Sequence, residues 1–260
     1  MTIAEWVVVG VKYIASVSFG KDSLAMVLRL IEEGKPLDEV VFYDTGMEFQ
    51  AIYNIRDRMK AVFAEHEIQF TELKPDKPFL WQMLAYPFQK KTGEYQYGYA
   101  WCGGCARWGT TEKLKKIAEY CKGTHQYVGV AYDEPIRVQR LTENKSAPLA
   151  EWKMTEADCL RYCREKGYDW SENGIDLYDI LSRVSCWCCR NKNKEELRNI
   201  WKYLPDYWCR LKALQSRIPE PMKSYKNRQY GEYGNLYDME KVFEQEEQTR
   251  QLTLFDYDRS

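Results

Sequence analysis

The feature that most constrains the fold is a short apolar segment that leads directly into a glycine turn and then into a helical pattern. Residues 13–17 are apolar and partly β-branched, which is typical of a buried strand. Gly20 follows within the turn 18–23, and apolar residues then recur at helical spacing over 24–33. This order of strand, turn and helix predicts the first unit of an α/β sheet.

The same alternation continues through the first half of the chain. Further strands are predicted at 40–43, 68–73 and 126–130, with helices at 49–66 and 110–120. Parallel strands need long crossovers, which are usually helical, and such sheets are covered on both faces. The pattern therefore predicts an α/β, Rossmann-like fold, in which a parallel sheet carries helices on both faces.

Composition divides the chain into three parts. Residues 1–150 hold the α/β pattern, interrupted at 75–100 by an aromatic, proline-containing stretch that we expect to be an irregular insertion over the ligand end of the sheet. Residues 151–219 are predicted to form a helical cysteine module packed on this domain. Residues 220–260 are polar and tyrosine-rich, which predicts a weakly ordered tail. Helices of the module are expected at 155–166, 177–183, 194–203 and 205–218.

Charge and hydropathy exclude several classes of protein. The 38 basic and 39 acidic residues give a net charge of -1, so nucleic acid binding would need a local patch. The longest apolar run, residues 6–17, contains Lys12 and is too short to span a membrane. The residues before it lack the basic start of a secretory signal. We therefore expect a cytoplasmic protein that makes no membrane contact.

The turn at residues 18–23 has the chemistry of an anion-binding site. It places backbone amides and a helix N-terminus at one point. Lys21 adds a positive charge, and Ser18 and Ser23 add hydroxyl donors. The turn is not a Walker A loop, because Lys21 is followed by Asp22 rather than by Ser or Thr. The alternative is a glycine-containing helix entry that binds nothing.

Four segments of the chain resemble motifs of one family. The turn 18–23, S-F-G-K-D-S, resembles the PP-loop of the ATP pyrophosphatase and phosphoadenylyl sulfate (PAPS) reductase superfamily. Residues 42–49 are similar to the D-T-G segment that helps form the adenosine pocket of PAPS reductases. Residues 129–137 are similar to the family's G-[IV]-R-x-x-E-S segment, and residues 147–152 to its P-L-x-x-W stretch. The resemblance to PAPS reductase-like proteins covers about residues 14–214.

This resemblance implies a site for ATP or a related adenine nucleotide with Mg²⁺. The phosphates would lie on the turn and the adenosine against the D-T-G segment. The nucleotide-binding residues that the resemblance implies are Ser18, Phe19, Gly20, Lys21, Asp22, Ser23, Asp44, Thr45, Gly46, Glu134 and Arg137. Of these, Lys21, Asp22 and Ser23 are expected to be catalytic, with Lys21 and the turn amides stabilising charge that develops on the phosphates.

Two C-x2-C pairs form a second candidate site, made of Cys102 with Cys105 and of Cys186 with Cys189. Four thiolates suit a tetrahedral Zn²⁺ site or a 4Fe-4S cluster. Similar proteins that reduce adenylyl sulfate, thiolate tRNA or sulfurate DNA carry an iron-sulfur cluster on paired cysteines. Cys188 could replace Cys189 as a ligand, or stay free as a catalytic sulfur carrier or nucleophile. The alternative for both pairs is a set of small buried side chains, which is what we expect of Cys121, Cys159, Cys163 and Cys209.

Two departures from the reductase pattern bear on the reaction. Ala131 stands where many reductases carry an arginine that grips the sulfonucleotide. No cysteine follows Cys209, whereas the reductases have an E-C-G-I-H tail that supplies the nucleophile. The sequence therefore favours cleavage at the nucleotide's α-phosphate to activate a substrate, with sulfur transfer to nucleic acid. The alternatives are a thiol-dependent PAPS or adenylyl sulfate reductase, and a non-catalytic nucleotide-sensing adaptor tethered to a sliding clamp.

Two further features bear on partners. Gln251-Leu252-Thr253-Leu254-Phe255 resembles the peptide with which bacterial DNA polymerases and repair proteins dock on the sliding clamp. An extended segment could bury its apolar side chains in a groove, and the alternative is a strand that packs on its own domain. The oligomeric state is open and includes a homo-oligomer. Basic residues beside the cysteine pairs suit nucleic acid or a charged partner, although solvated helical faces are commoner; they are Lys113, Lys115, Lys116, Arg190, Lys192, Lys194 and Arg198.

Overall fold

A computed structural model describes residues 10–102, 108–227 and 231–257, with backbone only at 225–227, 231–233 and 250–257. The chain divides into two units. The first comprises residues 1–78, 109–179 and 183–187, and the second comprises residues 79–108, 180–182 and 188–260. The expected insertion thus groups mostly with the C-terminal residues, while residues 151–179 group with the α/β pattern.

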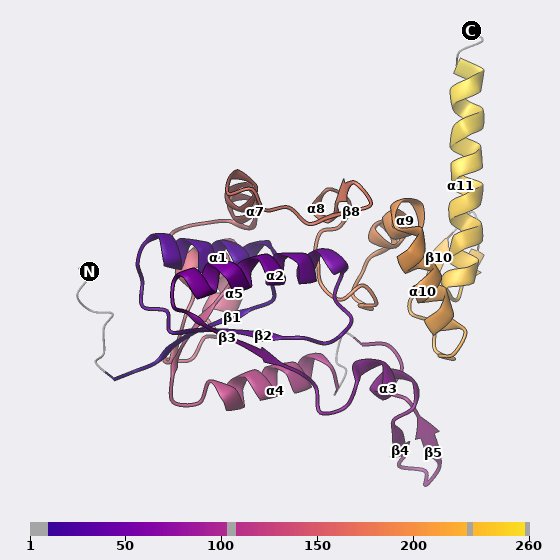
Figure 1. Cartoon of the computed structure of the whole chain (residues 1–260). Coiled ribbons are helices and arrows are strands. Elements are labelled where there is room, and N and C mark those ends of the chain that lie inside the picture. The colour runs from indigo at the N-terminus through magenta and orange to yellow at the C-terminus, as the bar shows by residue number, and fades with distance from the viewer. Residues whose placement is uncertain (1–9, 103–107, 228–230, 258–260) are drawn as a thin grey trace. The chain divides into compact units, whose positions relative to one another are not determined.

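A five-stranded sheet in which every pair of neighbours is parallel forms the centre of the first unit (Figure 1). The strand order is β3-β2-β1-β6-β7. β2 is buried along its whole length, as a sheet covered on both faces requires. The strands are β1 (Tyr13–Val17), β2 (Glu39–Tyr43), β3 (Gln69–Leu73), β6 (His125–Val128) and β7 (Lys145–Ser146).

Helices cover both faces of this sheet, which confirms the predicted α/β class. α1 (Lys21–Glu32) and α2 (Gln50–Glu65) lie on one face, and α4 (Thr110–Tyr120) lies on the other (Figure 1). α7 (Glu156–Glu165) packs against α1. The smaller elements of this unit are α5 (Pro135–Val138), α6 (Pro148–Glu151), β8 (Ser171–Glu172), β9 (Ile175–Asp176) and α8 (Leu177–Ile180), whose last residue is assigned to the second unit.

The second unit holds three hydrogen-bonded elements within the stretch that was expected to be an irregular insertion. They are α3 (Phe79–Leu84) and the antiparallel pair β4 (Pro87–Gln89) and β5 (Tyr95–Tyr97). The expectation of irregularity was wrong because the aromatic residues pack on one another, as described below. α9 (Lys194–Tyr203) and α10 (Pro205–Gln215) follow in the same unit, close to the predicted ranges.

The expected weakly ordered tail contains a hairpin and a long helix. β10 (Tyr225–Asn227) pairs with β11 (Gly231–Tyr233), and α11 covers Leu236–Tyr257. Buried apolar residues at helical spacing hold the first half of α11, namely Leu236, Met239, Val242 and Phe243. Residues 251–255, expected to be extended, lie in this helix. No helix in the described part of the chain is both long enough and apolar enough to cross a membrane.

Candidate functional site

Three predicted segments follow neighbouring strands of the parallel sheet. The turn 18–23 follows β1, the D-T-G segment follows β2, and the segment 129–137 follows β6. β1 pairs with β2 on one side and with β6 on the other, so the three carboxyl ends meet at one edge. Ligands of open α/β sheets bind where the strand order reverses, and β1 is that position here.

Phe19 fixes the shape of the turn. Its φ of +56° lies in the left-handed region, which a bulky residue adopts only when its surroundings hold it there. The Phe19 ring is fully buried, 5.2 Å from the Phe42 ring between centroids. Its carbonyl accepts a hydrogen bond of 2.8 Å from the indole of the fully buried Trp170. Trp170, which the sequence did not single out, therefore holds the turn from the side of α7 and α8.

Ser18 and Ser23 form hydrogen bonds within the turn. The Ser18 amide donates to the Ser23 hydroxyl at 3.1 Å, and the Ser23 hydroxyl donates to the Gly20 carbonyl at 3.2 Å. The Ser18 hydroxyl lies 3.2 Å from the Ser23 hydroxyl and accepts from the Gly20 amide at 3.5 Å. Both hydroxyls, which were expected to bind nucleotide, thus hold the loop in shape. The amides of Asp22 and Ser23 lie in the first turn of α1, before intrahelical bonding begins, and have no partner among the described residues. These amides give the site its anion-binding capacity.

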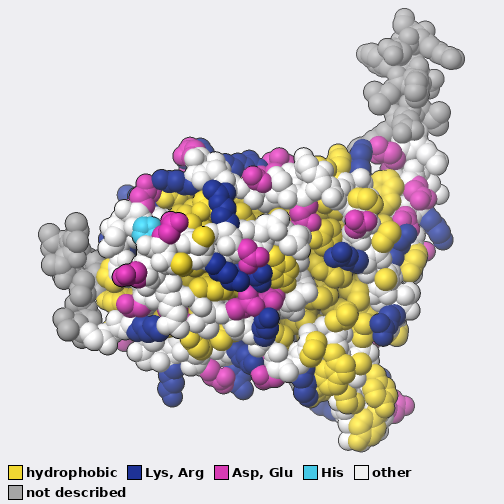
Figure 2. Space-filling model, in the orientation of Figure 1, with side chains coloured by type: hydrophobic (Ala, Val, Ile, Leu, Met, Phe, Trp, Pro, Cys, Tyr) yellow, Lys and Arg dark blue, Asp and Glu magenta, His cyan; other side chains and the backbone are white. Residues whose placement is uncertain are grey.

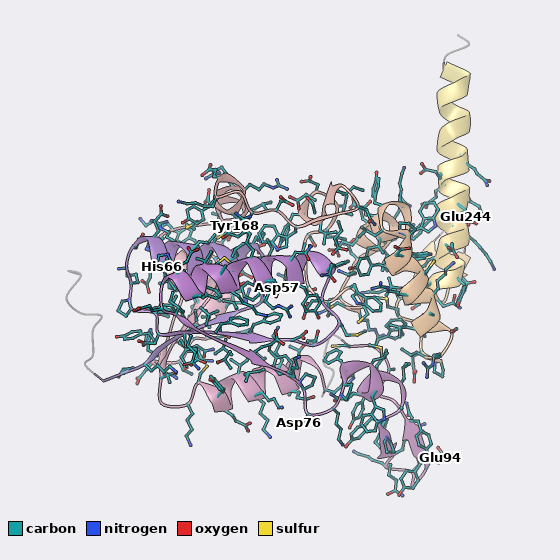
Figure 3. The ribbon with its side chains drawn as sticks, in the orientation of Figure 1. Asp57, His66, Asp76, Glu94, Tyr168 and Glu244 are labelled. Atoms are coloured by element: carbon teal, nitrogen blue, oxygen red, sulfur yellow. The ribbon has the colours of Figure 1, made fainter. Side chains whose placement is uncertain are left out.

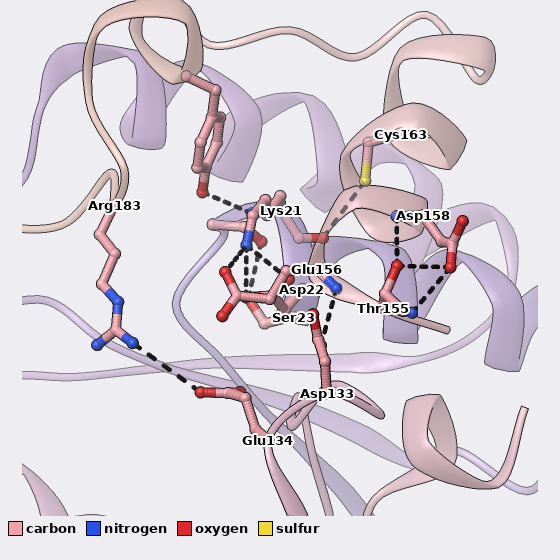
Figure 4. Close-up of polar contacts among 12 residues, drawn as sticks. Lys21, Asp22, Ser23, Asp133, Glu134, Thr155, Glu156, Asp158, Cys163 and Arg183 are labelled. Carbon is pink, nitrogen blue, oxygen red and sulfur yellow. Dashed lines mark hydrogen bonds and ion pairs between the residues drawn. The ribbon is translucent and has the colours of Figure 1, made fainter. Parts of the chain in front are cut away.

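Lys21 is the buried cation of the site, with 7% of its surface exposed. Its ammonium lies 2.6 Å from a Glu156 carboxylate oxygen and 3.0 Å from an Asp22 oxygen (Figure 4). Burial by itself lowers the pKa of Lys21, but the charges and hydrogen bonds of the two carboxylates outweigh it, so the pKa is raised. Lys21 is therefore charged and already paired with two anions.

Asp22 is the partner of Lys21 whose ionised form is disfavoured by burial. Burial raises its pKa, and the neighbouring ammonium of Lys21 opposes that shift without cancelling it. The carboxylates of Glu156 and Glu134 raise the pKa further. The Lys21 ammonium is thus paired with the carboxylates of Asp22 and Glu156, so a polyanionic phosphate must compete with these two for Lys21.

Glu156, which contacts Lys21, is the first residue of α7, and a capping box fixes the start of that helix. The Thr155 hydroxyl accepts from the Asp158 amide at 3.2 Å, and the Thr155 amide donates back to the Asp158 carboxylate at 3.0 Å. The hydrogen bonds from Thr155 lower the pKa of Asp158 to about 2. The sequence predicted a helix at 155–166 but gave no sign that its first residues would face a lysine far away in the chain.

Tyr178 is a second contact that the sequence did not reveal. Its hydroxyl accepts a hydrogen bond of 2.8 Å from the Lys21 amide, the first amide of α1. Burial raises the pKa of Tyr178, so the hydroxyl stays protonated. A Cβ on Gly20 would lie 3.1 Å from this oxygen, which explains the glycine at that position.

The D-T-G segment is held by its own side chains. The Asp44 carboxylate accepts from the Gly46 amide and from the Tyr53 hydroxyl, both at 2.8 Å. The Thr45 hydroxyl accepts from the Met47 amide at 3.1 Å, and Gly46 has a φ of +73°, which favours glycine. The turn after β2 therefore presents a fixed backbone at the same edge as the turn 18–23.

The segment after β6 approaches α1 closely at Gly129. A Cβ there would lie 2.8 Å from the Ser23 Cα, a backbone atom that cannot move aside. Glu134, expected to bind nucleotide, accepts from the Arg137 guanidinium at 2.5 and 2.6 Å. The guanidinium of Arg183 lies 4.0 Å from the same Glu134 carboxylate. Glu134 and Arg137 are thus paired with each other at the rim of the site.

The four predicted metal ligands are divided between the two units and the residues that the structure does not describe. Cys105 lies outside them, Cys186 belongs to the first unit, and Cys102 and Cys189 belong to the second. Across residues 10–102, 108–227 and 231–257 there is no group of three or more His, Cys, Asp or Glu placed to hold a metal ion. The four-cysteine centre therefore stays a prediction from the sequence, with Cys105 outside the described residues.

The backbone nevertheless places cysteines beside other predicted segments within each unit. In the first unit, Cys186 forms an antiparallel bridge with Glu48, just after the D-T-G segment. In the second, the amide of Arg190 donates to the Cys102 carbonyl at 3.0 Å, so Cys102 lies next to the Cys189 segment. Cys188 is buried, as are Cys121, Cys159 and Cys163, whereas Cys209 is exposed on α10, contrary to expectation.

Five of the seven basic residues beside the cysteine pairs are ion-paired or buried within their own units. Lys116 pairs with Asp76, Lys115 with Glu119, and both Lys194 and Arg198 with Glu246. Lys192 is buried. These contacts fit the alternative that the sequence left open, in which the charges belong to solvated, ion-paired faces of helices.

The parallel sheet, with the S-F-G-K-D-S turn and a helix N-terminus at its switch point, defines an α/β protein of the PP-loop class. The family model for the phosphoadenosine phosphosulfate reductase domain matches residues 12–170, and the chain belongs to this family. The resemblance drawn from the four sequence motifs is thereby confirmed.

Curated relatives agree with this assignment. An adenosine 5'-phosphosulfate reductase from Staphylococcus haemolyticus is 37% identical over 197 residues, which cover 71% of this chain and 74% of the relative. An uncharacterized protein from Methanocaldococcus jannaschii is 28% identical over 207 residues, 74% of this chain, and the match spans only 38% of that longer relative.

Among solved structures, the U34-tRNA thiolase NcsA from Methanococcus maripaludis with its [4Fe-4S] cluster is similar to the chain. The match has 14% sequence identity and a TM-score of 0.43, and covers 79% of this chain and 72% of the thiolase. This similarity is too low to carry an argument about function.

Proposed function

We propose that the chain binds ATP or a related adenine nucleotide at the carboxyl ends of β1, β2 and β6, and that it cleaves at the α-phosphate to activate a substrate for sulfur transfer to nucleic acid. The observation that carries the proposal is the buried Lys21 ammonium beside the unpartnered amides of Asp22 and Ser23. The curated reductase and the family model, both named for adenine nucleotides, support the choice of base.

In this reaction the chain's own groups bind and polarise the phosphates. The Asp22 and Ser23 amides donate to phosphate oxygens, and Lys21 leaves Glu156 to neutralise the charge that develops in the transition state. An acceptor oxygen attacks the α-phosphorus, and the bond to the bridging oxygen breaks, so that pyrophosphate leaves with the electron pair. The carboxylates of Asp22 and Glu156 are hard oxygen ligands that suit Mg²⁺, which would supply further charge neutralisation when bound.

The adenylylated product is the activated substrate. The terminal sulfur of an external persulfide attacks the activated carbon, and AMP leaves with the electron pair of the carbon–oxygen bond. A second external thiol then attacks the inner sulfur of the donor, so that the sulfur–sulfur bond breaks, the donor leaves as a disulfide and sulfur stands in place of the acceptor oxygen. We place the persulfide donor outside the described site, because Cys159 and Cys163, the thiols that interact with Lys21 and Asp22, are fully buried. Burial raises the pKa of Cys159 to about 12, which keeps its thiol protonated and unreactive.

A thiol-dependent sulfonucleotide reductase is the second candidate, because the Staphylococcus haemolyticus relative at 37% identity carries that name. The two reactions differ in product. The first releases pyrophosphate from ATP, and the second releases sulfite from adenylyl sulfate or PAPS when a thiol is present. A nucleotide-sensing adaptor would bind nucleotide and release neither product.

The first prediction separates these functions with Lys21→Ala. We expect wild-type protein to release pyrophosphate from ATP when RNA or DNA is added, and Lys21→Ala to lose at least about 100-fold in rate because one charge that stabilises the transition state is gone. Pyrophosphate and sulfite are measured in parallel. Lys122→Ala, an exposed lysine of the same unit, is the control and should retain activity. Release of sulfite without release of pyrophosphate would contradict this proposal and favour the sulfonucleotide reductase.

A further inference from the structure

The β4–β5 hairpin of the second unit exposes two tyrosines on one face. Tyr95 and Tyr97 are 67% and 69% exposed, the largest values among the exposed large hydrophobic side chains of the described residues. They alternate with Gln96 along β5 and stand opposite Gln89 and Pro87 of β4. We call these four residues, Tyr95, Tyr97, Gln89 and Pro87, the tyrosine face. Hydrophobic side chains gather over this hairpin (Figure 2), and Glu94 lies near its tip (Figure 3).

The hairpin is held by aromatic packing that does not use the tyrosine face. The rings of Tyr86 and Phe88 stack on the Tyr99 ring at centroid distances of 4.7 and 5.1 Å, with interplanar angles of 21° and 20°. Tyr99 in turn lies 6.1 Å from the Trp108 ring in a stacked arrangement. These contacts stabilise the hairpin from within, so Tyr95 and Tyr97 are not needed for its packing.

Backbone contacts fix the same hairpin against α3. The amides of Tyr99 and Ala100 donate to the Gln82 and Met83 carbonyls at 2.9 and 3.1 Å. Gly98 has a φ of +79°, and a Cβ there would lie 2.4 Å from the Met83 carbonyl oxygen. The two exposed rings therefore stand on a fixed support, which reduces the entropy lost when a ligand orders them.

The two tyrosines are separated along the strand by about twice the repeat of stacked bases. Residues two apart on an antiparallel strand lie about 6.8 Å from each other along the strand. Stacked nucleotides repeat at about 3.4 Å, so the spacing leaves room for one base between two rings, or one base on each. Tyrosines on an open sheet face are a common stacking platform for single-stranded nucleic acid, whose bases are free to turn outward.

The charge of the hairpin also suits a polyanion. Lys90 and Lys91 lie in the loop between β4 and β5, both exposed, and neither forms an ion pair among the described residues. Glu94 is the one acidic residue in the stretch 79–100. The basic residues beside the cysteine pairs are largely paired or buried, so these two lysines are placed to contact phosphates that flank stacked bases.

The size of the face argues against a protein partner. Each strand has three residues, so the face is only about 10 Å long. A stable protein interface buries about 800 Å² on each partner, several times what such a face offers. We infer that the tyrosine face, with Lys90 and Lys91, is a binding surface for single-stranded nucleic acid. The inference rests on the proposed function for its biological role, since it names the acceptor class, but the binding itself requires no nucleotide.

The test measures the affinity of the full chain for a fluorescein-labelled single-stranded dT oligonucleotide of about 12 nucleotides by anisotropy. Loss of base stacking is worth about 1–3 kcal/mol per base. We therefore expect Tyr95→Ala with Tyr97→Ala to weaken binding at least about tenfold, and Tyr95→Phe with Tyr97→Phe to stay within about twofold of wild type. Tyr203→Ala, a partly exposed tyrosine of α9, is the matched control and should bind as wild type does.

The two lysines are tested through salt dependence. The change of Lys90→Gln with Lys91→Gln should reduce the slope of log affinity against log salt by about 0.7 for each phosphate that the protein no longer neutralises. Lys21→Ala should lose pyrophosphate release and keep oligonucleotide binding, so a failed reaction and a failed binding surface give different results.

Three results would overturn the inference. One is a wild-type protein that does not bind the oligonucleotide. Another is a double alanine variant that binds as tightly as wild type while circular dichroism shows it folded. The third is a wild-type dimer in sedimentation that the double alanine change dissociates, which would make the tyrosine face a contact between two copies of the chain.

Discussion

At the scale of single residues, the main feature of the site is the pairing of the Lys21 ammonium with the carboxylates of Asp22 and Glu156, with which a bound phosphate would compete. The motif predicted the loop, its lysine and its helix N-terminus because those residues are adjacent in sequence. It did not predict Glu156 or Tyr178, since each contacts Lys21 from a distant part of the chain through tertiary packing. Sequence reasoning therefore predicted the loop groups proposed to bind an anion and missed Glu156 and Tyr178, which contact them.

Glu156→Gln tests that restraint. Glutamine keeps the size and hydrogen-bonding capacity of the side chain and removes its charge, so phosphate no longer competes with a carboxylate for Lys21. The Glu156 side chain is 32% exposed, and a partly exposed ion pair is worth at most about 1 kcal/mol. We expect ATP to bind up to about fivefold more tightly, as measured by isothermal titration calorimetry without Mg²⁺.

The control for this change is Glu165→Gln, an exposed residue near the end of the same helix that should leave the affinity unchanged. The titration is repeated with Mg²⁺. Weaker binding of ATP to the Glu156 variant only in the presence of the cation would show that this carboxylate serves the metal rather than restraining the lysine.

At the scale of elements, prediction succeeded where local signals determine a boundary. The helices at 110–120 and 194–203 have the predicted bounds, and α7 lies within one residue of its predicted range 155–166 at each end. β7 has two residues and no detectable periodicity, so it was missed. The helix α11 was missed because its polar composition outweighed the spacing of four apolar residues that pack its first half.

Gly129→Ala tests how closely β6 and α1 must approach. The added methyl group would lie 2.8 and 2.9 Å from the Ser23 Cα and amide nitrogen, so the end of β6 must move away from the helix. We expect a loss of about 1–3 kcal/mol in the free energy of unfolding, measured by urea denaturation. ATP affinity should fall as well, because the Ser23 amide shifts.

Gly234→Ala is the matched control, since a Cβ there meets nothing within 4 Å and its φ is not in the left-handed region. It should change the free energy of unfolding by less than about 1 kcal/mol. A Gly129→Ala variant as stable as this control would show that the contact at Ser23 relaxes without cost.

At the scale of the whole molecule, the residues of the proposed nucleotide site all belong to the first unit, whereas the paired cysteines are divided between both units. The parallel sheet was predictable because periodicity and motif agree over residues 12–170, the range of the family match. The four-cysteine centre could not be tested in the same way, because its ligands come from distant turns and one of them, Cys105, is not described. Ligand spacing predicts that a metal is bound but does not specify which one.

Elemental analysis of the full chain, purified without oxygen, tests the predicted centre. Since four thiolates hold either metal, we expect one Zn²⁺ per chain, or about four irons with matching acid-labile sulfide and visible absorption. Cys186→Ser should release the metal, whereas Cys209→Ser, which changes an exposed cysteine of α10, should retain it. Metal loss should also lower thermal stability, because binding energy at a structural site contributes to folding. A wild-type chain without iron or zinc, or a Cys186→Ser variant that keeps its full content, would mean that these cysteines serve packing alone.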